Sequence, residues 1–174
     1  MTGTLVRIAV SQGGVPKLAT PSATLLANGI VGDACRYPFH GGRRKAILLI
    51  TIEGIELLIA QGFALFPGAL GENLTTRGLD RRHLQPGQRL RIGEAAIELT
   101  QVRTPCATLD VYGSGIQAAL FDEHVMAGDC ASPRWGLSGF YASVVEPGII
   151  RAGDTITLLP QPDLIRDADP GVVL

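Results

Sequence analysis

Glycine and proline interrupt this chain at short intervals, and that spacing restricts the folds it can adopt. The 174 residues include 22 glycines and 11 prolines. Over residues 66–103 they separate short runs of strand-forming residues. Short strands at close spacing are typical of a closed or nearly closed β structure, so we expect a barrel-like fold.

Three further segments favour strands. Residues 3–12 alternate apolar and polar side chains and are rich in β-branched residues. Residues 45–50 end in a continuous apolar run, which predicts a buried strand. Residues 139–159 contain two strand-like runs joined by Pro147 and Gly148, a pair that predicts a turn.

Two helices are predicted among these strands. Thr51 can cap the first helix, and Gly62 can end it. The second covers residues 115–128. The fold class is therefore α+β and mostly β, with a domain over residues 1–160 and a loosely ordered tail over 161–174. The apolar positions with helical spacing in the first helix are Ile52, Ile55, Leu58 and Ile59, with Glu53 and Glu56 turned outward.

Composition excludes several classes of partner. The formal net charge is −1, so no global charge favours nucleic acid or an anionic membrane. No segment approaches the roughly 20 apolar residues of a membrane-spanning helix, and the N-terminus lacks a signal-peptide pattern. We therefore expect a cytoplasmic protein. The cysteines are odd in number and form no CxxC pair, which predicts reduced thiols at Cys35, Cys106 and Cys130.

Cys106 is the first candidate for chemistry. It follows Pro105 in the segment VRTPCATLD, where a strand-like run gives way to a turn or helix start. Only a thiolate acts as a nucleophile or soft-metal ligand, and a helix N-terminus or a nearby cation such as Arg103 favours that form. Free cysteines are also often small buried hydrophobes, so the residues alone leave both interpretations open.

Two other segments carry chemically suggestive residues. In HGGRRK, residues 40–45, paired glycines and three cations could bind a phosphate, but the same residues also suit a solvated surface turn. In GENLT, residues 71–75, Glu72 and Asn73 could serve a site, although a turn explains them equally simply. The remaining candidates are expected to be surface or packing residues: His83, His124, Cys35, Cys130, Trp135 and Tyr141.

The order of these motifs resembles that of one family. The segments GIVGDACRYPFHGGRRKAILL, PGALGENLTTRGLDRRHLQPGQRLRIGEAAIELTQVRTPCATL and GFYASVVEPGIIRAGDTITLL are similar to the MOSC domain, named for the C-terminal domain of molybdenum cofactor sulfurase. The likeness runs from the first strand to about residue 159. It implies a MOSC-type β-barrel-like fold with inserted helices.

The resemblance also implies roles for the candidates. Cys106 matches the family cysteine that carries a persulfide or ligates molybdenum in the pterin cofactor. The cofactor, molybdopterin with its metal, ends in a phosphate, which makes His40, Gly41, Gly42 and Lys45 the candidates to hold its phosphate or pterin.

Other matched positions follow from the same likeness. Arg103 would place a cation near the metal. Glu72 and Asn73 would hydrogen-bond the pterin edge or shape the pocket wall. Asp33 matches the family's GD pair, where a structural carboxylate and a functional one remain equally open.

Two functions are consistent with the resemblance. In the first, the protein is an oxidoreductase that binds molybdenum cofactor through Cys106 and reduces N-hydroxylated or N-oxygenated small molecules with an external electron donor. In the second, Cys106 carries a persulfide or the cofactor for another enzyme, with sulfur supplied by a donor protein. A MOSC-like scaffold without cofactor is a third alternative. The sequence shows no pyridoxal phosphate domain, flavin motif, haem motif or iron–sulfur motif.

Overall fold

The computed structural model describes residues 1–34 and 41–160. Its strands are β1 (Thr2–Val10), β2 (Leu18–Thr20), β3 (Ser22–Leu26), β4 (Gly29–Ile30), β5 (Ile47–Thr51), β6 (Leu74–Arg77), β7 (Arg89–Ile92), β8 (Ala95–Val102), β9 (Phe140–Glu146), β10 (Gly148–Arg151) and β11 (Thr155–Leu158). Its α-helices are α1 (Ile52–Ala60), α2 (Ile116–Leu120) and α3 (Glu123–Met126), and its short 3-10 helices are η2 (Arg43–Lys45), η3 (Arg81–His83) and η4 (Ala107–Tyr112).

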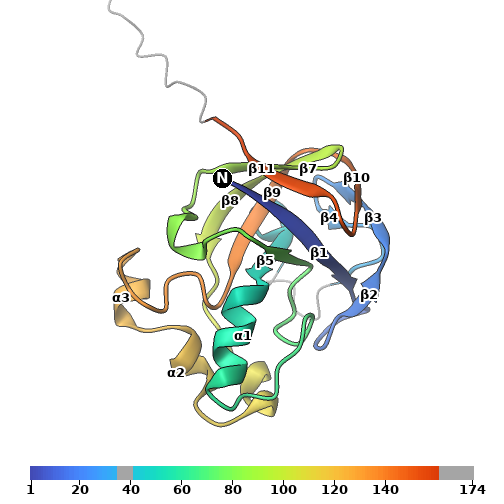
Figure 1. Ribbon diagram of the computed structural model, residues 1–174. Coiled ribbons are helices and arrows are strands. Elements are labelled where there is room, and N and C mark those ends of the chain that lie inside the picture. Colours follow the sequence, from blue (N-terminus) through green and yellow to red (C-terminus); the bar gives the residue numbers. More distant parts are fainter. Residues whose placement is uncertain (35–40, 161–174) are drawn as a thin grey trace, which may run out of the picture.

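The main sheet closes into a barrel. Its strand order is β11-β7-β8-β9-β5-β6-β1-β2, and a further pairing of β11 with β1 joins the two sides. The closed ring therefore contains seven strands, with β2 appended to β1. Closure leaves few unpaired strand edges, and the helices gather on one side of the barrel (Figure 1). The predicted mostly β, barrel-like fold class is confirmed.

Strand β5 is buried on both faces because it belongs to two cores. Ile47 and Leu49 point into the barrel. Leu48 and Ile50, on the opposite face, pack in a second apolar cluster with α1, α2 and η4. Since successive side chains of a strand alternate in direction, a continuous apolar run is what a wall between two cores requires. This outer cluster also supports the candidate site.

The first predicted helix is confirmed. Its cap is Thr51, whose hydroxyl accepts a hydrogen bond from the amide of Gly54 at 3.3 Å. The chain leaves the helix at Gly62, which has a φ of 95°, a conformation that glycine adopts without strain. This helix connects β5 to β6, the parallel pair of the barrel.

The prediction of one helix over residues 115–128 is wrong. The segment forms two short helices, α2 and α3, with extended backbone at Phe121 and Asp122 between them. The Asp122 carboxylate accepts a hydrogen bond from the amide of Val125 at 2.9 Å, which starts a new helix instead of continuing the old one.

The prediction of two strands over residues 139–159 is also corrected, because the segment forms three. At Pro147 and Gly148 the chain leaves the barrel strand β9 and enters β10, which pairs with β3 in a separate three-stranded sheet. A Cβ at Gly148 would lie 2.7 Å from the carbonyl oxygen of Glu94, so the close approach at this junction requires glycine. Strand β11 then returns to the barrel. The predicted C-terminal tail, 161–174, lies outside the described residues.

Candidate functional site

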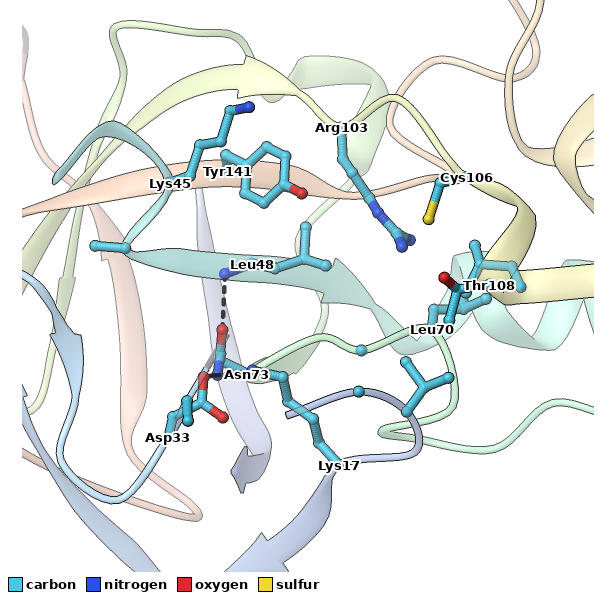
Figure 2. A pocket seen from close by; sticks show the side chains of 16 residues that line it. Lys17, Asp33, Lys45, Leu48, Leu70, Asn73, Arg103, Cys106, Thr108 and Tyr141 are labelled. Carbon is cyan, nitrogen blue, oxygen red and sulfur yellow. Dashed lines mark hydrogen bonds and ion pairs between the residues drawn. The ribbon is translucent and has the colours of Figure 1, made fainter. Parts of the chain in front are cut away.

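A pocket lies against the outer face of the barrel wall. Its floor comes from β5 and β9 through Leu48 and Tyr141, and its sides come from residues 14–17, 70–73 and 103–109. Figure 2 shows these side chains converging from segments that are far apart in the sequence. The structure therefore brings the PC, GEN and HGGRRK segments, each predicted separately, to one site.

Cys106 stands at the edge of this pocket. It occupies the N-cap position of η4 with extended backbone, and its side chain makes no cap hydrogen bond. The thiol is partly exposed, and its sulfur points into the pocket (Figure 2). A thiol in this position is accessible to a ligand.

Arg103 points toward the same space. Its residue is only 7% exposed, and its backbone is fixed because its amide donates to the carbonyl of Gly139 at 2.9 Å and its carbonyl accepts from the Ser138 hydroxyl. The guanidinium faces the pocket beside Cys106 (Figure 2). Within the described residues its buried Nη1 has no hydrogen-bond partner. A buried donor left unpaired costs about 1–3 kcal/mol, so this nitrogen is suited to an acceptor group on a bound molecule.

Glu72 lies behind the pocket wall. It is fully buried and is not among the described residues that line the pocket. Its Oε1 accepts hydrogen bonds from the Gly68 amide and from the Thr75 hydroxyl, and its buried Oε2 has no partner in the described part of the chain. Burial raises the pKa of Glu72, against the opposing effects of these hydrogen bonds and of the charge on Arg103. The structure thus places Glu72 behind the described lining, and its contact with the pterin edge stays a prediction.

Asn73, its neighbour, does line the pocket. Its side-chain oxygen accepts from the amide of Leu48 at 3.1 Å, and its side-chain nitrogen donates to the carbonyl of Ala9 at 3.3 Å and to Asp33 at 2.8 Å. These bonds connect β5, β1 and the loop that carries Asp33. The side chain of Asn73 therefore holds the pocket wall together.

Asp33 and Lys17 form a buried ion pair at the end of the pocket away from Cys106 (Figure 2). Their side chains are 9% and 10% exposed. The Asp33 carboxylate also accepts from the amide of Ser11 at 2.8 Å and from Asn73, so it has a structural role whatever else it does. The sequence motifs did not identify Lys17, because a single lysine after a glycine-rich turn has no distinctive spacing.

The glycine-rich segment contributes less than its motif suggests. Lys45 lines the pocket, but Gly41 and Gly42 are not among the described lining residues, and His40 lies outside the described part of the chain. The Lys45 ammonium sits over the ring of Tyr141, 5.5 Å from its centre. Tyr141, expected to be a packing residue, is half-buried and lines the pocket as well.

Comparison with known proteins agrees with this arrangement. The family model described as the MOSC domain matches residues 36–157, which is most of the chain. This chain belongs to the MOSC domain family. The match includes the HGGRRK, GEN and PC segments, which contribute Lys45, Asn73 and Cys106 to the pocket.

Curated relatives of this MOSC domain include two bacterial proteins. The uncharacterized protein YflK of Bacillus subtilis is 31% identical over 123 residues, covering 69% of this chain and 50% of YflK. Protein YiiM of Escherichia coli is 30% identical over 107 residues, covering 62% of this chain and 40% of YiiM. The matched part of the chain thus spans half or less of each relative's length.

Solved structures show the same fold. The crystal structure of YiiM from Escherichia coli superposes with a TM-score of 0.67 at 24% identity, covering 93% of this chain and 71% of that one. The YuaD protein of Bacillus subtilis superposes with a TM-score of 0.66 at 23% identity, covering 90% and 94%. At these identities the likeness establishes the MOSC-type fold.

Most remaining candidates of this MOSC domain lie away from the pocket. The side chains of His83 and His124 are 75% and 66% exposed, and Cys130 is exposed. Trp135 is buried and donates its indole N–H to the carbonyl of Leu84 at 2.9 Å, as a packing residue should. Cys35 lies outside the described residues. No helix in the described ranges is long and apolar enough to cross a membrane.

Proposed function

We propose that this MOSC domain binds molybdenum cofactor with the Cys106 thiolate as a metal ligand and reduces N-hydroxylated or N-oxygenated small molecules. One observation carries the proposal: the Cys106 sulfur faces the same pocket as the Arg103 guanidinium, whose buried Nη1 has no hydrogen-bond partner among the described residues. A thiolate is a soft ligand suited to molybdenum, and a guanidinium is suited to oxygen or phosphate acceptors.

The charges lining the pocket fit an anionic cofactor. Three described lining residues are cationic, namely Lys17, Lys45 and Arg103, whereas Asp33 is the one carboxylate among them. Asp33 pairs with Lys17, so cationic side chains outnumber carboxylates among the described lining residues, which suits an anion. Molybdenum cofactor carries a phosphate and metal-bound oxygen and sulfur, so these side chains are the ones we expect to hold it. His40, Gly41 and Gly42 precede Lys45 in the same segment of the sequence and belong to the same proposed phosphate contact.

The protein side chains have distinct tasks in this proposal. When bound, the cofactor would supply the two electrons that break the N–O bond of the substrate. Cys106 fixes the metal at the edge of the pocket, and Arg103 donates hydrogen bonds to oxygen there. Leu70 and Leu109 present an apolar wall that limits water around the reacting groups. The electrons come from a separate cytoplasmic reductase, and neither nucleic acid nor a membrane takes part.

The test compares wild-type protein with Cys106→Ala, both produced in a host that makes the cofactor. Cys130→Ala is the matched control, because it removes an exposed thiol outside the described pocket lining. We expect molybdenum and pterin in the wild type and in Cys130→Ala, and loss of molybdenum from Cys106→Ala. Cofactor-loaded wild type with an electron donor should then consume an N-hydroxylated substrate.

The same preparation separates the alternatives. Absence of molybdenum from the wild type, together with a persulfide on Cys106 found by mass spectrometry, would favour the sulfur carrier and refute the reductase. Retention of molybdenum by Cys106→Ala would remove Cys106 from the proposed ligand role.

A further inference from the structure

We infer that the phenol of Tyr141 is the acid that protonates the oxygen leaving the N-hydroxylated substrate. The inference rests on the proposed reductase function and adds a catalytic residue that the sequence motifs did not suggest. Figure 2 shows the Tyr141 hydroxyl pointing into the pocket, toward the guanidinium of Arg103 and the side on which Cys106 lies.

The position of Tyr141 follows from strand alternation. In β9, Phe140 and Ala142 are buried in the barrel core, so Tyr141 between them points outward. It pairs with Leu48 of β5 and with Gln101 of β8, which fixes its backbone in the middle of the sheet. A proton donor on a rigid strand is held in one place relative to the thiol.

The reaction requires such a donor. Reduction of R–NH–OH to R–NH2 takes two electrons from the external reductase and two protons, breaks the N–O bond and releases the oxygen as water. The departing oxygen would otherwise leave as hydroxide, and protonation by a positioned side chain typically contributes a factor of about 100 to 10,000 in rate. Tyr141 gives one proton to this oxygen and regains it from solvent; the second reaches the substrate nitrogen from solvent.

Other polar side chains of the described lining suit the task less well. Asp33 accepts three hydrogen bonds, and one of its donors is the Lys17 ammonium. Arg103 does not lose its proton in proteins, and the Thr108 hydroxyl would leave a strongly basic alkoxide. A phenol keeps its proton at neutral pH and forms a far more stable anion than an aliphatic alcohol does.

The cationic side chains of Lys45 and Arg103 share the pocket with Tyr141. The Lys45 ammonium lies 5.5 Å from the ring centre, and Arg103 lines the same pocket. Positive charges near an acid favour its deprotonated form. In this proposal Lys45 and Arg103 balance the negative charge that forms on the phenol as the N–O bond breaks.

The experiment compares cofactor-loaded wild type, Tyr141→Phe and Tyr112→Phe. Tyr112→Phe is the matched control, since it removes a phenol that is not among the described lining residues and whose ring packs edge-on against Phe66. Molybdenum content and the thermal unfolding midpoint are measured first, without substrate. The kcat and KM are then measured with an N-hydroxylated purine and a chemical reductant. Wild type with 3-fluorotyrosine at position 141 provides a second variant that keeps the hydroxyl and the fold.

We expect Tyr141→Phe to keep its molybdenum and its unfolding midpoint, to lose about 100-fold or more in kcat, and to change KM by no more than about threefold. The fluorinated protein should remain active, and Tyr112→Phe should match wild type. A Tyr141→Phe kcat within about threefold of wild type overturns the inference and leaves the reductase proposal standing. Loss of molybdenum from Tyr141→Phe overturns it too, because Tyr141 would then hold the cofactor. A wild type that contains molybdenum but reduces none of a broad panel of N-hydroxylated substrates refutes both.

Discussion

Replacement of Asn73 by alanine should destabilise the cofactor-free protein strongly. Asn73 is 4% exposed, and its side chain bonds to the Leu48 amide, the Ala9 carbonyl and the Asp33 carboxylate. Alanine would leave the buried Leu48 amide without that acceptor, at about 1–3 kcal/mol, and would remove two further hydrogen bonds worth about 1 kcal/mol each. The expected loss in the free energy of unfolding is therefore about 3–5 kcal/mol, a large share of the total for an ordinary domain.

Chemical denaturation of the cofactor-free protein measures this loss directly, and the thermal midpoint should fall on the order of 10 °C. Asn28→Ala is the matched control, because Asn28 is exposed in a turn and should cost less than about 1 kcal/mol. A loss below about 1 kcal/mol for Asn73→Ala would refute the view that this side chain holds the pocket wall together. Asn73 would then have to be explained by ligand contacts alone.

Two predictions concern titration. Burial raises the pKa of Glu72, so the folded protein binds the carboxyl proton more tightly than the unfolded chain does. The free energy of unfolding therefore falls as the pH rises from the ordinary pKa of 4.5 toward the raised pKa. In denaturant unfolding, the free energy of unfolding of Glu72→Gln relative to wild type should therefore be more favourable at pH 8 than at pH 5. An equal difference at the two pH values would contradict this. Hydrogen bonding from Arg82 lowers the pKa of Asp80 from 3.8 to about 2. The stability that the ionised Asp80 carboxylate contributes is therefore complete above pH 3.8 and is lost as the pH falls through about 2. An NMR titration of the Asp80 carboxyl should show that midpoint in wild type and a higher one in Arg82→Ala, whereas an unchanged midpoint would exclude the Arg82 side chain as the cause.

The parts of the fold that could be predicted from the sequence are those fixed by nearby residues. Thr51 and the apolar spacing after it determine α1 locally, and the alternation in residues 3–12 determines most of β1. The split of residues 115–128 depends on one carboxylate, Asp122, competing for a backbone amide, which periodicity does not detect. The exit of the chain at Gly148 into a second sheet depends on β3, more than a hundred residues earlier, so no local pattern could reveal it.

In the candidate site, too, the sequence suggested the residues of a local motif, and only the fold revealed the others. Cys106 and Arg103 lie three residues apart, and the short segment between them was enough to suggest a shared site. Lys17 reaches the pocket because its loop packs closely on the loop that contains Gly68. The Lys17 amide donates to the carbonyl of Gly68 at 2.9 Å. A Cβ at Gly68 would lie 2.4 Å from the Lys17 carbonyl oxygen, so the contact depends on glycine at a position distant in sequence. Tyr141 carries no motif, and its direction became evident only from the strand register.

The pocket wall and the barrel core share one strand, and this determines which substitutions can report on function. Leu48 contributes its side chain to the pocket and its amide to Asn73, so a change at either position alters the fold and the site together. Cys106 differs, because its side chain makes no capping bond and a substitution there leaves these connections intact. Tyr141→Phe likewise removes one oxygen and keeps the packed ring. Loss of molybdenum at Cys106 or of turnover at Tyr141 can therefore be assigned to chemistry, whereas the same loss at Asn73 has meaning only after the stability of the variant is known.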